Sequence, residues 1–364
     1  MFHVVPTRLI PCFSALLLLA AAPRCTQPPA EALPQGAQPA PAPVVSIDRA
    51  LLAAFPALPS NFDVAGSVST PEMVALGQKL YHDPRLSKNH DVSCNSCHDL
   101  ARYGVDGLAL SPGHRGQLGK RNSPTVYNAA GHMAQFWDGR SPNVEHQATQ
   151  PLIGPTEMAS DEPHLVALLG SMPGYVAAFK AAFPGDKKPL SLTNTGHAIG
   201  AFERQLVTPS RWDAFLAGDA AVLNDQEKRG FNTFITTGCS TCHNGALVGG
   251  QMYMKAGLVK PWPTSTDAGR FDVTHQEADR GVFKVPSLRN VAKTAPYFHD
   301  GEVSSLAVAV HRMAELQLGR DLSAADTADI VAWLQTLTGV VPANLSAKPE
   351  LPPSTAKTPK PNPA

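Results

Sequence analysis

Two short cysteine–histidine motifs have residue types and a spacing that suit covalent cofactor chemistry. The pattern C-x-x-C-H occurs at 94–98 and again at 239–243. In this pattern the two thiols add to the vinyl groups of haem as thioethers, and the adjacent histidine is placed to bind iron. The sequence therefore predicts two covalent c-type haems. The residues that would hold them are Cys94, Cys97 and His98 in the first motif, and Cys239, Cys242 and His243 in the second. The competing interpretation, one zinc ion held by four thiolates, leaves both histidines unexplained.

The sixth ligand of each iron decides between electron transfer and catalysis. Two haems in one chain suggest a division of labour, with one closed six-coordinate electron port and one site that opens to substrate. Candidate ligands are histidines and methionines, and spacing alone does not choose among them. After the first motif these are His114, His132, Met133, His146 and Met158, and after the second they are Met252, Met254, His275, His299, His311 and Met313.

Capped helices should lead into both motifs. Thr70 and Pro71 are a capping hydroxyl and a first-turn proline, and apolar residues follow at helical spacing until Pro84. Asn224 can cap a second helix over 225–235, which ends just before the second motif. Each cysteine pair is therefore expected to follow the end of a helix.

The rest of the chain also reads as helices and loops. Ser323 can cap a helix that runs to Leu337 and stops at Gly339. No run alternates as a set of strands. The sequence predicts a mainly α fold with two cytochrome c-like helical domains, one per haem. Long loops such as 104–135 and 245–297 should be held by the haems as much as by regular structure.

Length and composition bound the organisation. The chain has 364 residues, with 30 Lys and Arg against 30 Asp and Glu, and this zero net charge argues against a nucleic-acid partner. Its 34 prolines gather partly in two terminal stretches that have the composition of unfolded chain. The predicted segments are a signal peptide at 1–22, a Pro/Ala-rich tether at 23–45, an N-terminal haem domain at 46–208, a C-terminal haem domain at 209–341 and a disordered tail at 342–364.

The N-terminus predicts export to the periplasm. Arg8 precedes the apolar run 9–22, which is short for a membrane span and ends in small residues, as a cleaved signal peptide does. A retained anchor is the alternative interpretation of the same run. Lipid attachment at Cys25 is a third interpretation, and Arg24 directly before it argues against that processing.

Several longer motifs resemble the bacterial di-haem cytochrome c peroxidases. The resemblance runs from about 60 to 340, takes in both haem motifs in the right order, and is specific because the motifs are long and not compositional. They are LGQKLYHDPRLS (76–87), SPGH (111–114), RNSPT (121–125), AQFWDGR (134–140), VPSLRN (285–290) and TAPYFHDG (294–301).

This resemblance implies roles for residues around the first haem. His98 would be the proximal ligand of a peroxidatic haem, and His114 its distal ligand in the resting enzyme. Glu157 and Gln147 would line the distal pocket as catalytic residues, and Trp137 would lie between the haems.

The resemblance also implies the ligands of the second haem and of a calcium ion. His243 and Met313 would bind the electron-transfer haem, and Asn122 would hold calcium with the carbonyls of Thr294 and Pro296. In related di-haem enzymes that oxidise protein-bound tryptophan, a tyrosine replaces the methionine ligand. Met313 therefore favours the peroxidase.

The residue chemistry agrees with peroxide reduction. Breaking the peroxide bond needs a base that takes a proton from one oxygen and returns it to the other, and a carboxylate with a raised pKa can do both. Glu157 lies in a loop context suited to this role. The sequence thus predicts a periplasmic peroxidase that takes electrons from a small cytochrome c or a blue-copper protein, and it leaves a homodimer open. The alternatives are a di-haem oxidase of another substrate and a non-enzymatic di-haem electron carrier.

Overall fold

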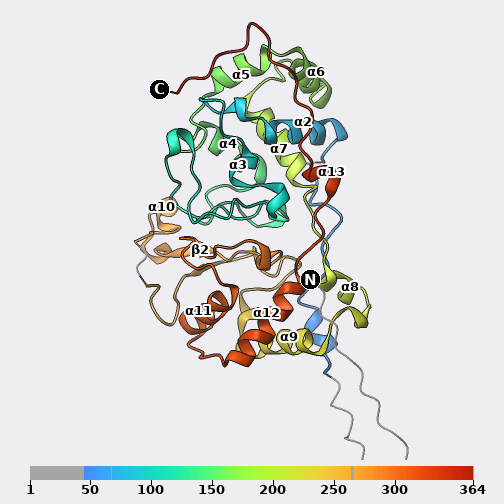
Figure 1. The fold of residues 1–364 in the computed structure, drawn as a ribbon, viewed down its shortest axis with the longest axis vertical. Coiled ribbons are helices and arrows are strands. Elements are labelled where there is room, and N and C mark those ends of the chain that lie inside the picture. Colours follow the sequence, from blue (N-terminus) through green and yellow to red (C-terminus); the bar gives the residue numbers. More distant parts are fainter. Residues whose placement is uncertain (1–44, 67, 264–265, 364) are drawn as a thin grey trace, which may run out of the picture. The chain divides into compact units, whose positions relative to one another are not determined.

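A computed structural model describes residues 45–66, 68–263 and 266–363 of the chain, which belong to one compact unit. The prediction of a mainly α fold is confirmed, since short helices and loops make up most of this part (Figure 1). The predicted signal peptide, most of the predicted tether, Cys12 and Cys25 lie outside the described residues.

The α-helices of the described chain are α1 (Arg49–Leu52), α2 (Pro71–His82), α3 (Cys94–Cys97), α4 (Val144–Ile153), α5 (Glu162–Gly170), α6 (Pro173–Ala182), α7 (Leu192–Glu203), α8 (Arg211–Leu216), α9 (Asp225–Thr237), α10 (Phe271–Thr274), α11 (Leu306–Leu318), α12 (Ala324–Thr336) and α13 (Ala343–Ser346). The strands are β1 (Tyr253–Lys255) and β2 (Val282–Lys284), which pair antiparallel. This small ribbon and a few isolated β-bridges in the described residues depart from the expectation of no strand pairing. Single 3-10 turns lie between these elements, including His114–Gly116 and Cys239–Thr241.

The three predicted helix starts are confirmed. Thr70 accepts a hydrogen bond from the Met73 amide at the start of α2. Asn224 forms a reciprocal capping box with Glu227 at the start of α9, and Ser323 caps α12. These side chains satisfy amide groups that have no partner within the helix, so local sequence was enough to place them.

The N-terminal lobe is built around α2, α4, α5, α6 and α7. Its core buries apolar residues from Leu76 to Leu206, among them Tyr81 and Phe202, whose rings meet edge to face. Gly77 lets α2 approach α7 closely, because a Cβ there would lie 1.9 Å from the Ala198 carbonyl oxygen. Among the described residues no single helix is long and apolar enough to cross a membrane; the bent pair α5 and α6 passes by length and composition only.

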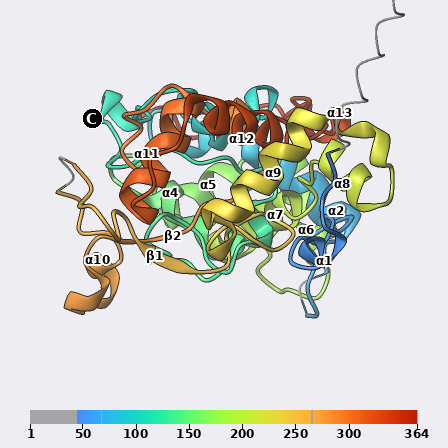
Figure 2. The ribbon, with the colours of Figure 1, turned by 90° about the horizontal axis from the view of Figure 1, so that it is seen from below.

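The C-terminal lobe has its own aromatic core between α8, α9 and α12 (Figure 2). Trp212, Phe231 and Trp333 are fully buried and contact one another. Phe55 packs against the same cluster, with Leu51 beside it. Residues 47–55 therefore belong to the core of the C-terminal lobe, although their position in the sequence assigned them to the N-terminal domain. Position in the chain does not predict this packing, because these few apolar residues contact a core around Trp212 that lies far along the sequence.

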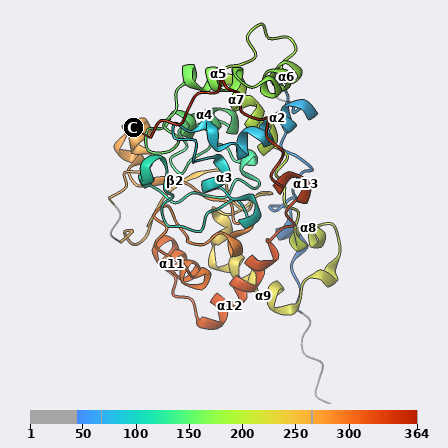
Figure 3. The ribbon, with the colours of Figure 1, turned by 45° about the horizontal axis from the view of Figure 1, so that its top comes forward.

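The described residues 342–363 of the predicted disordered tail contact the N-terminal lobe. This segment leaves the C-terminal lobe and runs along the N-terminal one (Figures 1 and 3). The Arg85 guanidinium donates to the Pro352 carbonyl at 2.9 Å and to the Ser354 hydroxyl at 2.8 Å. The Asn362 amide donates to the Lys88 carbonyl at 2.9 Å. Composition predicted disorder because few apolar groups are available, but proline-rich chain keeps its carbonyls free for such donors.

Candidate active site

The first haem motif forms the short helix α3, and His98 follows it directly. The Nδ1 atom of His98 lies 2.9 Å from the Pro124 carbonyl oxygen, and the Tyr81 hydroxyl donates to the His98 carbonyl at 2.6 Å. Burial lowers the pKa of His98 and keeps its ring neutral. A neutral ring that donates from Nδ1 has its free lone pair on Nε2, which is the arrangement an iron ligand needs. Cys94 and Cys97 are free thiols on the same turn.

The turn after α4 carries Glu157. Its backbone is tied to the end of that helix, where the Glu157 amide donates to the Gly154 carbonyl at 3.1 Å. Burial raises the pKa of the Glu157 carboxyl, and the nearby Arg140 guanidinium opposes that rise. The Glu157 carboxylate in turn contributes to the raised pKa of the Cys94 and Cys97 thiols. Glu157 and the first haem motif therefore belong to one site.

The loop that carries His114 rests on this same turn. The His114 amide donates to the Glu157 carbonyl at 2.7 Å. Gly113 makes the approach possible, because a Cβ there would lie 2.1 Å from the Thr156 carbonyl oxygen. The His114 side chain is 4% exposed, and its Nδ1 atom is buried without a hydrogen-bond partner. A buried imidazole nitrogen without a partner is costly in a folded protein and suits a group that binds a ligand held in the site.

The other candidate ligands of the first haem have different surroundings. Met158 is part of the hydrophobic core, and Met133 is 41% exposed. The Nδ1 atom of His146 lies 2.8 Å from the Ser141 hydroxyl, and that of His132 lies 3.1 Å from the Lys284 ammonium group. Gln147 lies half-buried on α4, the helix that leads into the Glu157 turn.

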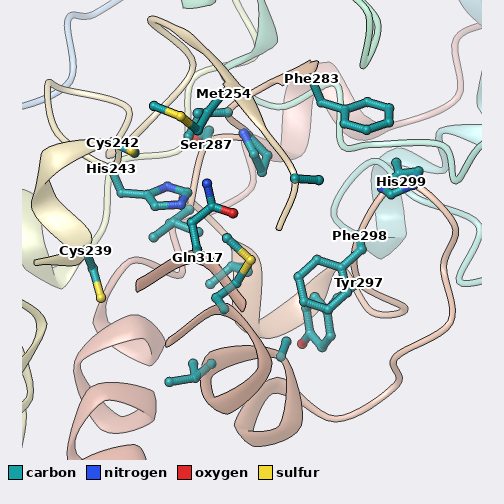
Figure 4. A pocket seen from close by; sticks show the side chains of 18 of the residues that line it. Cys239, Cys242, His243, Met254, Phe283, Ser287, Tyr297, Phe298, His299 and Gln317 are labelled. Carbon is teal, nitrogen blue, oxygen red and sulfur yellow. The ribbon is translucent and has the colours of Figure 1, made fainter. Parts of the chain in front are cut away.

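The second haem motif opens onto a largely apolar cavity of about 240 Å³. Cys239, Cys242 and His243 all line it and are grouped at one side (Figure 4). The Nδ1 atom of His243 lies 3.3 Å from the Val248 carbonyl oxygen, and burial lowers the pKa of His243 to about 4. As at His98, this leaves Nε2 as the atom with the free lone pair. An apolar cavity beside two thiols and a neutral imidazole fits a covalently held haem.

One face of α11 forms part of the wall of this cavity. Met313 lies on it, between Ala309 one turn earlier and Gln317 one turn later. Met254 and His299 also line the cavity and remain within reach as alternatives. His275 is exposed and His311 is half-buried, and neither they nor Met252 line the cavity. The structure thus narrows the candidate second ligands of this haem to Met313, Met254 and His299 without choosing among them.

Residues of the two lobes meet at the edge of the cavity. Trp137 and Asn122 come from the N-terminal lobe and line the C-terminal cavity, where the Trp137 indole donates to the Asn122 carbonyl at 2.9 Å. Thr294 and Pro296, the other residues of the predicted calcium site, line it too. The Nδ2 atom of Asn122 donates to the Leu108 carbonyl at 2.9 Å, so the side-chain oxygen of Asn122 points away from that carbonyl. The predicted inter-haem and calcium residues therefore lie together.

The four-thiolate zinc interpretation is wrong. The cysteine pairs belong to different lobes, with Cys94 packed against the first core and Cys239 against the second. Within the part of the chain that the structure describes, no group of three or more His, Cys, Asp and Glu side chains could hold a metal ion.

Sequence reasoning missed two features of the site. One is Arg140, whose guanidinium lies 3.4 Å from the centre of the Phe136 ring and lowers the pKa of Glu157. Arg140 is the last residue of the motif AQFWDGR (134–140), but the sequence around it does not show which carboxylate it faces. The other is the contact of His132 with Lys284, two residues 152 positions apart in the chain.

Comparison with known proteins agrees with this geometry. Residues 71–221 match the family model described as di-haem cytochrome c peroxidase. The cytochrome c551 peroxidase of Nitrosomonas europaea is 46% identical over 299 residues, which cover 81% of this chain and 88% of that protein. The cytochrome c551 peroxidase of Pseudomonas aeruginosa is 46% identical over 304 residues, covering 82% and 87%.

A solved structure shows the same fold. The crystal structure of a MauG-like protein associated with microbial copper homeostasis superposes with a TM-score of 0.71 at 30% identity, covering 80% of this chain and 95% of the other. Two haem motifs in separate helical lobes, and relatives that match most of both lobes, lead to the same result. The chain belongs to the family of di-haem cytochrome c peroxidases.

Proposed function

We propose that this chain reduces hydrogen peroxide to water in its N-terminal lobe with electrons that enter through its C-terminal lobe. One peroxide, two electrons and two protons give two waters. The relatives named cytochrome c551 peroxidases support the substrate class. The observation that carries the proposal is the half-buried Glu157 carboxyl, which shares one site with the first haem motif and with His114.

The two C-x-x-C-H motifs would hold the haems that the family implies. Haem bound at each motif would supply iron that exchanges single electrons, and in the N-terminal lobe a coordination position for peroxide. His98 and His243 each have Nε2 as the free ring nitrogen, which supports them as the proximal ligands. His114, with a buried unpartnered Nδ1, is the proposed distal ligand of the resting N-terminal site.

Glu157 would carry the proton that peroxide cleavage moves. Burial raises the pKa of its carboxyl, so that one oxygen can accept a proton from peroxide and release it to the departing oxygen. The Arg140 guanidinium opposes this rise in the pKa of Glu157. Gln147, on the helix that ends at this turn, would hydrogen-bond to bound peroxide.

Met313 is the proposed second ligand of the electron-entry site. It lies on the face of α11 that lines the same cavity as His243, and a thioether raises the reduction potential as electron entry requires. Its presence favours a peroxidase over an oxidase of another substrate. Trp137 would lie on the path between the two sites, because it belongs to one lobe and lines the cavity of the other.

Three further assignments complete the proposal. Calcium would bind at Asn122 with the carbonyls of Thr294 and Pro296, which line one cavity. The electron donor would be a small cytochrome c or a blue-copper protein in the periplasm, reached after cleavage of the predicted signal peptide. A homodimer is the proposed assembly to test by light scattering.

The test is peroxide reduction by the Glu157→Gln variant, which keeps the shape of the side chain and removes the base. Stopped-flow turnover should fall by roughly 10²-fold, with haem content and absorption spectra unchanged. The matched control is Glu72→Gln, which alters an exposed carboxyl of α2 in the same lobe and should leave turnover unchanged. Comparable turnover in the two variants would contradict the role of Glu157.

A further inference from the structure

A buried lysine and a half-buried histidine contact each other beside the C-terminal cavity. The Nζ atom of Lys284, on β2, lies 3.1 Å from Nδ1 of His132 in the N-terminal lobe. The whole Lys284 residue is 7% exposed. His132 is held closely as well, since a Cβ on Gly250 would lie 2.5 Å from its ring.

This pair has no acidic partner in the described part of the chain. Burial alone lowers the pKa of Lys284 to about 8, and no carboxylate contributes to it. Burial, then the Lys284 charge, lowers the pKa of His132 well below its usual value, so the ring is neutral. No ion pair within the described ranges includes Lys284. Elsewhere the protein pairs its buried cations, as Arg204 with Glu145 and Arg289 with Asp213. A buried ammonium group without an anion is costly in free energy. The site is therefore suited to bind an anion that the polypeptide does not supply.

The position of Lys284 identifies the anion. Lys284 lines the same cavity as Cys239, Cys242 and His243. Thioether bonds form at the vinyl groups of a porphyrin, and its two carboxylates lie at the opposite edge of the ring. Lys284 lines the cavity that would hold this porphyrin, so its ammonium group is available to those carboxylates.

We propose that the Lys284 ammonium group binds a carboxylate of the porphyrin attached to Cys239 and Cys242, and that His132 is a positioning residue for it. His132 accepts one of the three ammonium hydrogens at Nδ1, which fixes the lysine and leaves two donors for an oxygen acceptor. The backbone amide of Lys284 donates to the Trp137 carbonyl at 2.7 Å. The same residue would thus hold the porphyrin edge and the tryptophan that lies between the lobes.

The proposal has an electrochemical consequence. A positive charge beside a porphyrin carboxylate favours the reduced iron, because reduction removes one positive charge from the metal. Loss of that charge should lower the midpoint potential of the electron-entry haem. The inference rests on haem at the second motif and does not require peroxide turnover, so it can fail while the proposed function stands.

The experiment is a spectroelectrochemical titration of the purified di-haem protein with Lys284→Gln and Lys284→Arg, after the haem content of each is measured. Lys284→Gln should weaken reduction of the electron-entry haem about tenfold, which is about 59 mV for a one-electron couple. Lys284→Arg keeps the charge and should recover most of that change. Lys260→Gln removes an exposed lysine of the same lobe, paired with Glu315, and is the control expected to leave the potential in place.

Resonance Raman spectroscopy of the porphyrin carboxylate bending mode gives a second measurement. The mode should shift in Lys284→Gln and to a lesser degree in His132→Phe, which loses the positioning contact. An unchanged potential and an unchanged carboxylate mode in Lys284→Gln would overturn the proposal. So would an equal fall in Lys284→Arg, because that result would assign the effect to packing and not to charge. If the porphyrin mode is unchanged but added inorganic phosphate alters the potential of the parent protein only, Lys284 binds a free anion instead.

Discussion

The contact between the His114 loop and the Glu157 turn can be tested by adding one methyl group, in Gly113→Ala. Gly113 has φ of −110°, so alanine introduces no left-handed backbone strain. Its Cβ would lie 2.1 Å from the Thr156 carbonyl oxygen and 2.7 Å from the Glu157 Cα atom. Both are backbone atoms that cannot rotate away, so the loop and the turn must separate.

The expected size of the effect follows from this overlap. Forcing one extra carbon into a packed contact costs about 1–3 kcal/mol. Separation also breaks the 2.7 Å hydrogen bond from the His114 amide to the Glu157 carbonyl. If the closed loop holds His114 on iron in the oxidised protein, the ratio of closed to open loop should fall about 5- to 150-fold.

Electron paramagnetic resonance and stopped-flow kinetics measure that ratio. Oxidised Gly113→Ala should show a larger high-spin signal from the N-terminal haem and should react with peroxide with less need for prior reduction. Gly119→Ala is the matched control in the same loop, because its Cβ would meet its neighbours at 3.7 and 3.8 Å, an ordinary contact. A Gly113→Ala protein with a lower melting temperature but the spin state and activation of the parent would refute a mobile His114 ligand.

Three other outcomes follow from the structure. Met313→His should lower the potential of the electron-entry haem by roughly 100 mV or more in a redox titration, because imidazole favours ferric iron more than thioether does; an unchanged potential would assign another ligand. Burial raises the pKa of Glu203 to about 8, so the folded chain keeps a proton that the unfolded chain releases above about pH 4.5. The free energy of unfolding of the protein should therefore decrease as the pH rises from about 4.5 to 8. Urea titrations of the Glu203→Gln variant should show no such decrease. Removal of residues 352–364 should lower the melting temperature, since it deletes two hydrogen bonds from Arg85; an unchanged value would show that the tail adds no stability.

Local sequence was sufficient for the helices because their signals are local. The caps at Thr70, Asn224 and Ser323 each act on an amide three residues away. The contacts of the tail and of residues 47–55 could not be predicted from sequence, for the opposite reason. Their order depends on partners far along the chain, such as Arg85 for Pro352 and Trp212 for Phe55, which composition cannot reveal.

The same distinction applies to the candidate site. The haem motifs were readable because covalent attachment requires fixed spacing. Glu157 and His114 were assigned by resemblance, and their contact through the backbone was not foreseeable, since it depends on a missing side chain at Gly113. The charges of Arg140 and Lys284 matter only through the groups that they face, and no periodicity or cap encodes such a pairing.

The base of the His114 loop is tied to the C-terminal lobe at both ends. Asn122 follows the loop, and its amide donates to the His299 carbonyl at 2.8 Å. Ala109 precedes the loop, and a Cβ on Gly301 would lie 2.6 Å from the Ala109 Cα atom. The Asn122 side chain closes the base by donating to the Leu108 carbonyl. The segment 299–301 thus contacts both ends of a loop whose tip carries His114.

This arrangement gives a physical route for communication between the lobes. His299 lines the C-terminal cavity and stacks on Phe283 with ring centres 4.2 Å apart. We therefore expect a structural change inside that cavity to displace segment 299–301, which contacts the base of the His114 loop. Packed contacts have few alternative arrangements, and a small displacement at 299–301 should favour one loop position over another. A ligand or redox change shifts such an equilibrium only by its differential interaction with the two positions. This difference in interaction free energy would arise at the loop base, which contacts the C-terminal lobe on both sides. Its effect would be on the position of His114 beside the Glu157 turn.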